Sequence, residues 1–385
     1  MVRILVVDDE LDVEALIMQK FRNKVRRKEW EFTFSRNGEE ALEVLRKDHS
    51  VIDIVLSDIN MPKMDGLALL QKIGEEGFDL RTIVVSAYSD IENIRTAMNN
   101  GAFDFITKPI NFQDMEHTIQ RSFASLNEMR DALRSRDDLL VLKKELNLAH
   151  KIQQSILPRE FDVGERIDIH AFMTPAKEIG GDFYDFFNLS GDKIAALVAD
   201  VSGKGVPAAL FAMANQALIR GIASGLNEST AELLKKINIT CCKNNENCMF
   251  ITLFLAIIDK KTGELTYTNA GHTPPVLLTK GGSLDFLPLT DDVPLGISEL
   301  EDFSEKTIQL QPGDAIFVYT DGVTEAMNRD AEEVGTDRLL AELGKKQDAC
   351  LIDIDEHVYN EVQKFADGTR QFDDLTYLSL RYLGS

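Results

Sequence analysis

Short apolar runs rich in β-branched residues alternate with helix-like stretches over roughly the first 120 residues. The runs lie at Arg3–Val7, Phe32–Ser35, Ile52–Ser57, Thr82–Ser86 and Phe103–Ile106. Each run has the length of a strand, and the segments between them repeat apolar residues at three- and four-residue spacing. Strands that alternate with helices in this way predict an α/β domain with a five-stranded parallel sheet covered by helices on both faces.

A different pattern occupies residues 119–157, which contain neither glycine nor proline. Apolar residues recur there at helical spacing, but their register shifts by one position near residues 134–138. This predicts one long helix, or two abutting helices with a phase break, ending at Pro158. The apolar stripe favours either a coiled-coil homodimer or packing of the helix on the chain's own domains, and the pattern leaves both open.

From Arg159 onward, strand-like segments follow one another directly and the helical segments are segregated from them. This order predicts an α+β fold that is distinct from the first domain. We therefore place a first domain at residues 1–122, a helical linker at 123–158 and a second domain at 159–385.

Composition narrows the possible partners and location. The 64 acidic and 42 basic side chains give the 385-residue chain a net charge of -22, which disfavours binding to nucleic acid. The longest apolar run, Met249–Ile258, is much shorter than the roughly 20 residues of a spanning helix, and no signal peptide is recognisable. The four cysteines lack metal-binding spacing. We expect a cytoplasmic protein with reduced thiols that binds neither nucleic acid nor membranes.

Polar residues with complementary chemistry follow the predicted strands of the first domain. Asp8 and Asp9 follow the first strand, Asp58 follows the third, Ser86 ends the fourth and Lys108 follows the fifth. Because the carboxyl ends of parallel strands meet at one edge of a sheet, we expect these side chains to converge. Three converging carboxylates indicate a divalent cation such as Mg²⁺, and the added hydroxyl and ammonium groups indicate a pocket that accepts a phosphoryl group.

Residues 1 to about 122 resemble the receiver domain of two-component response regulators, which has a flavodoxin-like fold. The resemblance rests on the residues named above together with Met61–Pro62, Asp65–Gly66 and Pro109. The resemblance implies that Asp58 accepts the phosphoryl group. It also implies that Asp9, Asp58 and the Asn60 carbonyl hold Mg²⁺, with Asp8 acting through a water molecule.

The same resemblance assigns the switch residues and a partner. Ser86 would be the switch hydroxyl, Phe105 the switch aromatic side chain and Lys108 the cation that binds the phosphoryl group. The implied partner is a sensor histidine kinase or a phosphotransfer protein.

The second domain carries a separate set of acidic motifs, each flanked by apolar strand residues. They are Gly180–Asp185, Ala199–Gly205, Tyr319–Gly322 and Phe372–Thr376. Because buried carboxylates without partners are costly, their convergence would indicate bound metal or shared protons. The absence of interleaved His or Cys favours Mg²⁺ or Mn²⁺ over zinc, and the number of acids fits two ions that activate a water. The alternative for any single motif is an ordinary acid in a turn.

Together these motifs resemble the SpoIIE/RsbU branch of the protein phosphatase 2C (PPM) family over residues of about 140 to 383, and the fold implied is an α-β-β-α sandwich. Further matches lie in the helix before Pro158, at Asn269–Pro275 and at Pro294–Ile297. The resemblance implies a metal-dependent serine/threonine phosphatase with two Mg²⁺ or Mn²⁺ ions. The implied metal ligands are Asp182, Asp200, the Val201 carbonyl, Asp321 and Asp373, with Asp185 and Asp374 as nearby acids.

One departure concerns the proton donor. Lys204 stands where members of this branch often have histidine, and no arginine is clearly matched for phosphate binding. Lys204 as a phosphate-binding cation, His272 as a structural residue or a general acid, and solvent as the acid all stay open.

The combined prediction is a response regulator in which phosphorylation of Asp58 controls a phosphoprotein phosphatase. The implied substrate is a phosphorylated STAS-type antagonist of an anti-sigma factor. An alternative is a non-catalytic adaptor that binds a partner through a phosphatase-like domain. A DNA-binding regulator is disfavoured by the acidic charge and by the absence of a terminal helix-turn-helix pattern.

Overall fold

The computed structural model describes residues 1–48, 51–87, 90–161, 163–223, 229–243 and 245–384. The chain divides into two compact units, Met1–Val141 and Leu142–Ser385. The division lies inside the helical segment that we predicted as a linker.

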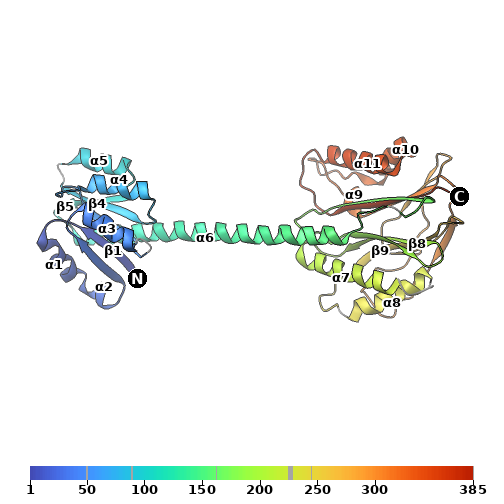
Figure 1. Ribbon diagram of the computed structural model, residues 1–385, viewed down its shortest axis with the longest axis horizontal. Helices are drawn as coiled ribbons and strands as arrows, with labels where there is room; N and C mark the ends of the chain where they lie inside the picture. Colours follow the sequence, from blue (N-terminus) through green and yellow to red (C-terminus); the bar gives the residue numbers. More distant parts are fainter. Residues whose placement is uncertain (49–50, 88–89, 162, 224–228, 244, 385) are drawn as a thin grey trace. The chain divides into compact units, whose positions relative to one another are not determined.

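The first unit is built around one parallel sheet (Figure 1). Its strands are β1 (Val2–Val7), β2 (Trp30–Ser35), β3 (Ile54–Asp58), β4 (Arg81–Ala87) and β5 (Asp104–Lys108), in the order β2-β1-β3-β4-β5. Its helices are α1 (Leu11–Lys20), α2 (Arg22–Arg26), α3 (Gly38–Asp48), α4 (Gly66–Glu76) and α5 (Ile91–Asn99). The predicted five-stranded parallel sheet is therefore confirmed.

The apolar alternation explains why the sheet is covered on both faces. Ile4 and Ile54 pack on one face in a cluster that includes residues of α1, whereas Leu5 and Val55 pack on the other in a cluster with α3 and α4. Since neighbouring strand residues point to opposite faces, strands without polar interruptions bury both sides. In β3 the polar residues Ser57 and Asp58 lie at the carboxyl end of the strand.

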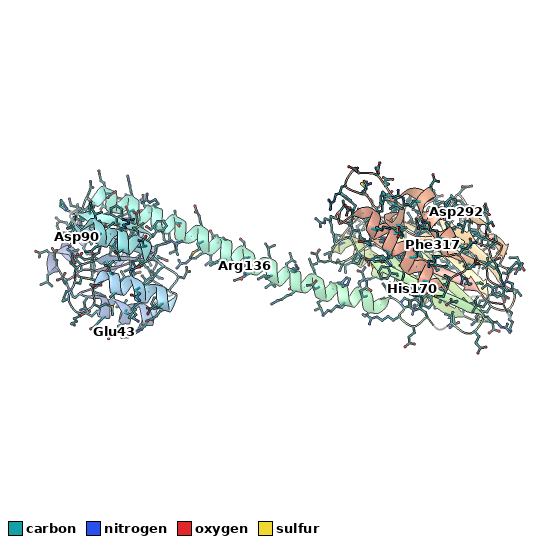
Figure 2. The ribbon with its side chains drawn as sticks, turned by 90° about the horizontal axis from the view of Figure 1, so that it is seen from above. Glu43, Asp90, Arg136, His170, Asp292 and Phe317 are labelled. Carbon is teal, nitrogen blue, oxygen red and sulfur yellow. The ribbon has the colours of Figure 1, made fainter. Side chains whose placement is uncertain are left out.

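Helix α6 runs without interruption from Phe112 to Ile156. Its first turns pack on the first unit, where Ile119 is fully buried and Arg130 pairs with Asp53 (Nη1–Oδ1 2.7 Å). The middle of the helix is exposed, as the side chain of Arg136 illustrates (Figure 2). The register shift near residues 134–138 thus falls on exposed turns of one continuous helix. The shift in the apolar pattern does not interrupt the helix.

The second unit contains two antiparallel five-stranded sheets (Figure 1). One has the order β13-β10-β9-β8-β7, formed by Lys306–Gln309, Glu264–Ala270, Ile251–Asp259, Lys193–Val201 and Phe183–Leu189. The other has the order β12-β11-β14-β15-β6, formed by Leu284–Phe286, Val276–Leu278, Ala315–Tyr319, Leu375–Tyr382 and Ile167–Thr174.

Helices cover the outer faces of these sheets. Helices α7 (Val206–Ala223) and α8 (Thr230–Lys243) pack on the first sheet, and α11 (Leu351–Ala366) packs on the second beside α10 (Gly335–Lys346). The short helix α9 (Asp321–Thr324) follows β14. The result is the predicted α-β-β-α sandwich. Helix α7 is long and apolar enough to cross a membrane by length and composition, but it contacts β7 and β8 as the core helix of a globular domain does.

Candidate functional site

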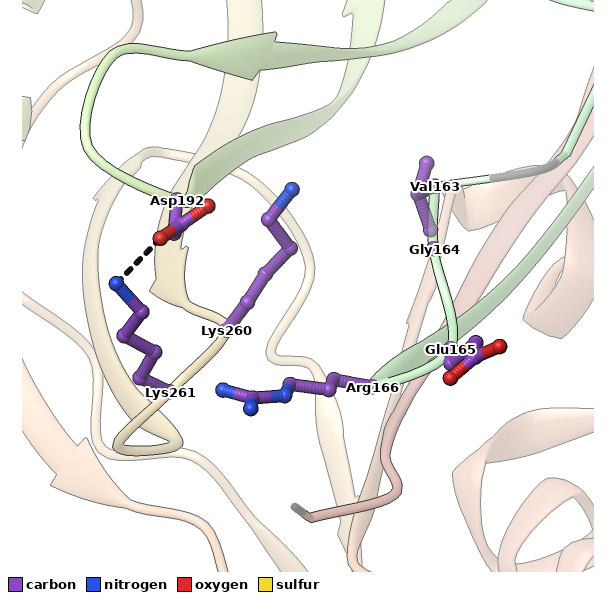
Figure 3. A pocket seen from close by; sticks show the side chains of 7 residues that line it. All are labelled: Val163, Gly164, Glu165, Arg166, Asp192, Lys260 and Lys261. Atoms are coloured by element: carbon purple, nitrogen blue, oxygen red, sulfur yellow. Dashed lines mark ion pairs between the residues drawn. The ribbon is translucent and has the colours of Figure 1, made fainter.

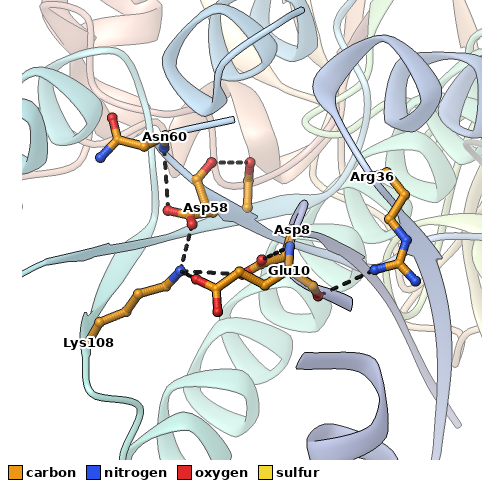
Figure 4. A network of polar contacts seen from close by, with 7 residues as sticks. Asp8, Glu10, Arg36, Asp58, Asn60 and Lys108 are labelled. Carbon is orange, nitrogen blue, oxygen red and sulfur yellow. Dashed lines mark hydrogen bonds and ion pairs between the residues drawn. The ribbon is translucent and has the colours of Figure 1, made fainter. Parts of the chain in front are cut away.

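The predicted residues of the first unit converge at the carboxyl edge of its sheet (Figure 4). Asp8 lies just after β1, Asp58 ends β3 and Lys108 ends β5. The Lys108 ammonium lies 2.6 Å from Asp58 Oδ2 and 3.5 Å from Asp8 Oδ2. Both aspartates are less than a tenth exposed, and burial raises the pKa of the Asp8 carboxyl. The pKa of Lys108 is raised by its bonds to Asp58 and Glu10, which outweigh the opposing effect of its burial.

Glu10 belongs to this pocket, although the sequence analysis did not select it. Its carboxylate lies 3.1 Å from the Lys108 ammonium, and its backbone N–H donates to Asp8 Oδ1 at 2.8 Å. Oxygens of Asp8, Glu10 and Asp58 lie within 4.8 Å of one another, whereas Asp9 is exposed and is not a member of that group. The signal that could have found Glu10 is a third consecutive acid after the first strand.

The remaining residues of the pocket have distinct environments. The Asn60 N–H donates to Asp58 Oδ1 at 3.3 Å, so its backbone borders the acceptor carboxylate. The Ser86 hydroxyl is buried and has no hydrogen-bond partner among the described residues. Phe105 is 40% exposed, so its ring lies at the surface and not in the core. A buried hydroxyl without a partner beside a carboxylate and an ammonium fits a pocket that receives phosphoryl oxygens.

The acidic motifs of the second unit come from both sheets. Asp182 precedes β7 and Asp200 lies near the end of β8, whereas Asp321 follows β14 and Asp373 precedes β15. Gly322 allows this convergence, because a Cβ atom at that position would lie 2.0 Å from the carbonyl oxygen of Asp374. The site therefore forms where the two sheets end side by side.

The carboxylates are close enough to repel one another. Burial, followed by repulsion from Asp200 and Asp374, raises the pKa of Asp182 well above its ordinary value. Burial and repulsion from Asp321 raise the pKa of Asp200 from 3.8 to about 7. The buried Oδ2 atom of Asp182 has no hydrogen-bond partner among the described residues. Carboxylates that are buried, mutually repelling and incompletely bonded form a cluster that is suited to a divalent cation.

Oxygens of Asp321, Glu325 and Asp373 form a second group within 4.8 Å of one another. Glu325 was not expected from the sequence. It is the C-cap residue of α9, and it joins the group because it lies one helical turn after Asp321. The Val201 carbonyl faces the backbone of Gly181, where a Cβ atom would lie 3.0 Å from it. The oxygen ligands present fit binding of divalent cations.

Asp374 and Asp185 have structural partners. Asp374 accepts the N–H groups of Ala176 at 2.7 Å and Gly181 at 2.5 Å, so it fixes the backbone that carries Asp182. Asp185 was expected near the metals, but its carboxylate is bound by the Arg220 guanidinium from α7, with Nε to Oδ2 at 2.9 Å. A carboxylate already neutralised by arginine is poorly placed to serve a metal ion as well.

The His272 ring is buried, and its Nε2 atom has no hydrogen-bond partner among the described residues. Its Nδ1 lies 3.0 Å from the Thr252 hydroxyl, and its backbone N–H donates to Asn269 Oδ1 at 2.7 Å. Burial lowers the pKa of His272 to about 3. The imidazole is therefore neutral at physiological pH, which opposes a role as the proton donor. The alternatives that remain are solvent as the acid and Lys204 as a cation that binds phosphate.

Two cavities in the described part of the second unit are candidates for the site. One, of about 240 Å³, is lined by Lys204, Glu325, Arg370 and Asp373 among others, and therefore borders the carboxylates. The other, of about 340 Å³, is lined by Arg166, Asp192, Lys260 and Lys261 among others (Figure 3). The larger cavity lies near Asp192, which precedes β8, whereas Asp200 lies near the opposite end of that strand. We place the chemistry at the smaller cavity because the clustered acids border it.

The raised pKa of Asp200 predicts a pH-dependent stability. The pKa of Asp200 is about 7 in the folded domain and 3.8 ordinarily, so the folded state binds the proton more tightly than the unfolded state. The stability that this proton contributes is lost as the pH rises through 7. With EDTA present, we expect thermal unfolding of the second unit to occur at lower temperature at about pH 8 than at about pH 6. Asp200→Asn should flatten this dependence, and an unchanged slope in scanning calorimetry would contradict the assignment.

Comparison with known proteins places both units. Residues 190–383 match the family model of stage II sporulation protein E, SpoIIE. The chain belongs to the SpoIIE family. Residues 4–120 match the response regulator receiver domain, so a receiver domain is joined to a SpoIIE-family phosphatase domain. This confirms the family and fold predicted from the motifs.

Relatives of this SpoIIE-family chain include phosphoserine phosphatase RsbU of Bacillus subtilis, which is 30% identical over 62% of this chain and 70% of RsbU. Protein IcfG of Synechocystis is 31% identical over 62% of this chain, which spans only 42% of IcfG. Among solved structures, the RsbU and RsbW domains of Rv1364c from Mycobacterium tuberculosis match with a TM-score of 0.51 and 28% identity, over 59% of this chain and 65% of that one. The SiaA-PP2C domain of Pseudomonas aeruginosa shares the fold (TM-score 0.58, 23% identity, 64% and 98% coverage).

Proposed function

We propose that this protein is a response regulator in which phosphorylation of Asp58 controls metal-dependent hydrolysis of a phosphoserine or phosphothreonine protein. The observation that carries the proposal is the convergence of Asp182, Asp200, Asp321 and Asp373 from two sheets, with a buried Asp182 oxygen that lacks a partner among the described residues. The matches to the receiver domain and to SpoIIE support both halves of it. The domain limits proposed are 1–122, 123–158 and 159–385.

The chain's own residues define the chemistry of the phosphatase site. Asp182, Asp200 and the Val201 carbonyl would hold one side of a pair of Mg²⁺ or Mn²⁺ ions, and Asp321 and Asp373 the other. When bound, such ions lower the pKa of a shared water and stabilise a phosphoryl group under in-line attack. Asp374 keeps the Asp182 backbone in place through its bonds to Ala176 and Gly181. Since His272 is neutral and buried, the proton for the leaving serine is assigned to solvent.

The receiver residues have matching roles. Asp58 would accept a phosphoryl group from a histidine kinase or phosphotransfer protein, with Asp8, Asp9, Asp58 and the Asn60 carbonyl as the proposed Mg²⁺ ligands and Glu10 beside them. Lys108 and Ser86 would bind the new oxygens. The relative RsbU is named a phosphoserine phosphatase, which supports phosphoserine as the group that is hydrolysed. The protein that we propose as its carrier is a phosphorylated STAS-type antagonist of an anti-sigma factor.

A contact between α6 and the metal motif supports control by the receiver. Lys108, which pairs with Asp58, ends the strand that leads into α6. At the far end of α6, the Gln153 carboxamide donates to the Gly180 carbonyl at 2.7 Å and accepts the Gly180 N–H at 3.2 Å. Gln153 is buried, and Gly180 stands two residues before Asp182. A shift of α6 would therefore move the backbone that positions a metal ligand.

The exposed part of α6 supports homodimerisation through the linker. Its apolar side chains remain open to solvent; they are Leu133, Leu139, Leu140, Val141, Leu142, Leu148 and Ile152. Exposed apolar side chains on a helix are stabilised when a second helix covers part of them. Pairing of two α6 helices would give phosphorylation a second route to the phosphatase domain.

Gln153→Ala should separate regulation from catalysis. Loss of both bonds to Gly180 removes the direct link between α6 and the metal motif, so we expect the response of turnover to Asp58 phosphorylation to fall about fivefold or more. Gln154→Ala, one residue along the same helix, is the matched control because its side chain faces Met173. Equal responses of Gln153→Ala and wild type to acetyl phosphate would refute this link.

The proposed function is tested by phosphate release from a phosphorylated STAS-domain protein in the presence of Mn²⁺, with and without acetyl phosphate. Release that requires Mn²⁺ and changes with acetyl phosphate is the expected result. Folded protein that binds this substrate without hydrolysing it under any of these conditions would instead support the adaptor.

A further inference from the structure

Lys204 occupies a position between the carboxylates and the cavity beside them. It follows β8 in the segment Gly203–Gly205, whose two glycines have positive φ angles of 93° and 82°. The Lys204 ammonium lies 2.7 Å from Asp373 Oδ2 and donates to the Phe372 carbonyl at 2.6 Å. One cation of the chain is thus bonded directly to an acid that we assign to the metal site.

The charge of Lys204 acts on the whole second group of acids. Asp321, Glu325 and Asp373 have oxygens within 4.8 Å of one another, so an ammonium bound to one of them lies in the field of all three. A divalent cation bound by these acids would be repelled by an ammonium at that distance.

Lys204 also has room to leave Asp373. Its side chain is 42% exposed, and it lines the cavity of about 240 Å³ that continues from the carboxylates toward Arg370. A Cβ atom at Gly203 would meet no atom within 4 Å, so the backbone next to Lys204 faces open space on that side. Lysine has a long, flexible side chain whose ammonium can move by several ångströms without a change in the backbone.

We propose that the Lys204 ammonium competes with a divalent cation for the carboxylates of Asp321, Glu325 and Asp373. The ammonium must leave this group before the cation binds there. The inference rests on the proposed metal-dependent function and adds to it a residue that sets metal affinity. Occupancy of this position would then depend on whatever else binds Lys204, including the phosphoryl group of the substrate in the adjoining cavity.

Lysine labelling tests the displacement without any assay of activity. The full chain is treated with acetic anhydride with and without Mn²⁺, and the acetylation of each lysine is measured by mass spectrometry. Because an ion-paired lysine reacts slowly, Mn²⁺ should raise the labelling rate of Lys204 about threefold or more. Lys261 pairs with Asp192 at 2.6 Å on the opposite side of the domain and serves as the control whose labelling should not change. Lys204 labelling that stays constant or falls with Mn²⁺ overturns the proposal.

Calorimetric titration of Mn²⁺ into variants provides the second measurement. Lys204→Gln should bind Mn²⁺ at the phosphatase site about fivefold more tightly than wild type, Lys204→Arg should remain close to wild type, and Lys261→Gln should be unchanged. The receiver site is present in all of them and cancels in the comparison. If Asp321→Asn loses a binding site while Lys204→Gln keeps wild-type affinity, only the competitor role is wrong. If Asp321→Asn loses none, the metal centre and the proposed function fail together with it.

Discussion

Asp200→Asn is expected to lower the rate of phosphate release from a phosphoserine protein by about a thousandfold or more. Asparagine keeps the shape of the side chain but removes the charge that would hold the cations. Asp200 lies near the end of β8, where burial and repulsion from Asp321 raise the pKa of its carboxyl and a hydrogen bond with Asp182 lowers it. The measurement is the initial rate of release at saturating Mn²⁺ by wild type and variant.

Asp185→Asn is the matched control for this prediction. Asp185 lies in the same motif as Asp182, but its carboxylate is bound to Arg220 and to the Phe186 N–H. Its loss should lower the free energy of unfolding by about 1–3 kcal/mol and leave the Mn²⁺-dependent rate within a few-fold of wild type. Comparable losses of turnover in Asp185→Asn and Asp200→Asn, with both proteins folded, would mean that the two acids have been assigned to the wrong roles.

Asp58→Asn is expected to abolish both the uptake of a phosphoryl group from acetyl phosphate and the resulting change in phosphatase rate. The carboxylate of Asp58 is the nucleophile in the proposed chemistry, and an amide cannot form the acyl phosphate. Its basal phosphatase rate should stay near that of unphosphorylated wild type, because the catalytic acids belong to the other unit. Phosphate incorporation is measured by intact-mass spectrometry and the rate by phosphate release.

Asp53→Asn is the control for Asp58→Asn. Asp53 is an acid of the same domain, but it is bonded to the Arg3 N–H at 2.9 Å and to Arg130 of α6. It should still permit phosphorylation of Asp58. A phosphorylation-dependent rate that persists in Asp58→Asn would show that regulation enters the protein at another residue.

Local patterns were sufficient to predict most of the fold. Continuous apolar runs such as Ile54–Leu56 indicate strands buried on both faces, and alternation with helices indicates a parallel sheet. The change to strands in direct succession after Arg159 indicated a second domain with an α+β fold. These predictions succeeded because side-chain periodicity reports directly on which faces of an element are buried.

Individual site residues were predicted less completely, because turn geometry and helix packing decide which neighbouring side chains enter a site. The positions of Asp8, Asp58, Asp182 and Asp200 could be predicted because each follows an apolar strand, and strand ends converge. The different positions of Asp9 and Glu10 could not be predicted, since the turn after β1 decides which of two adjacent acids faces Lys108. The pairing of Asp185 with Arg220 depends on how α7 packs over β7, which no local pattern records.

The sequence by itself determined the two domain types, the helical segment between residues 119 and 157, and the acidic motifs at strand ends. Only the tertiary structure decided which acids share a site, that Gln153 holds Gly180, and that Lys204 bonds to Asp373. The reason is that periodicity and motif spacing act over a few residues, whereas these contacts join segments far apart in the chain. Their geometry follows from how two sheets and their helices pack, and that packing is a property of the whole domain.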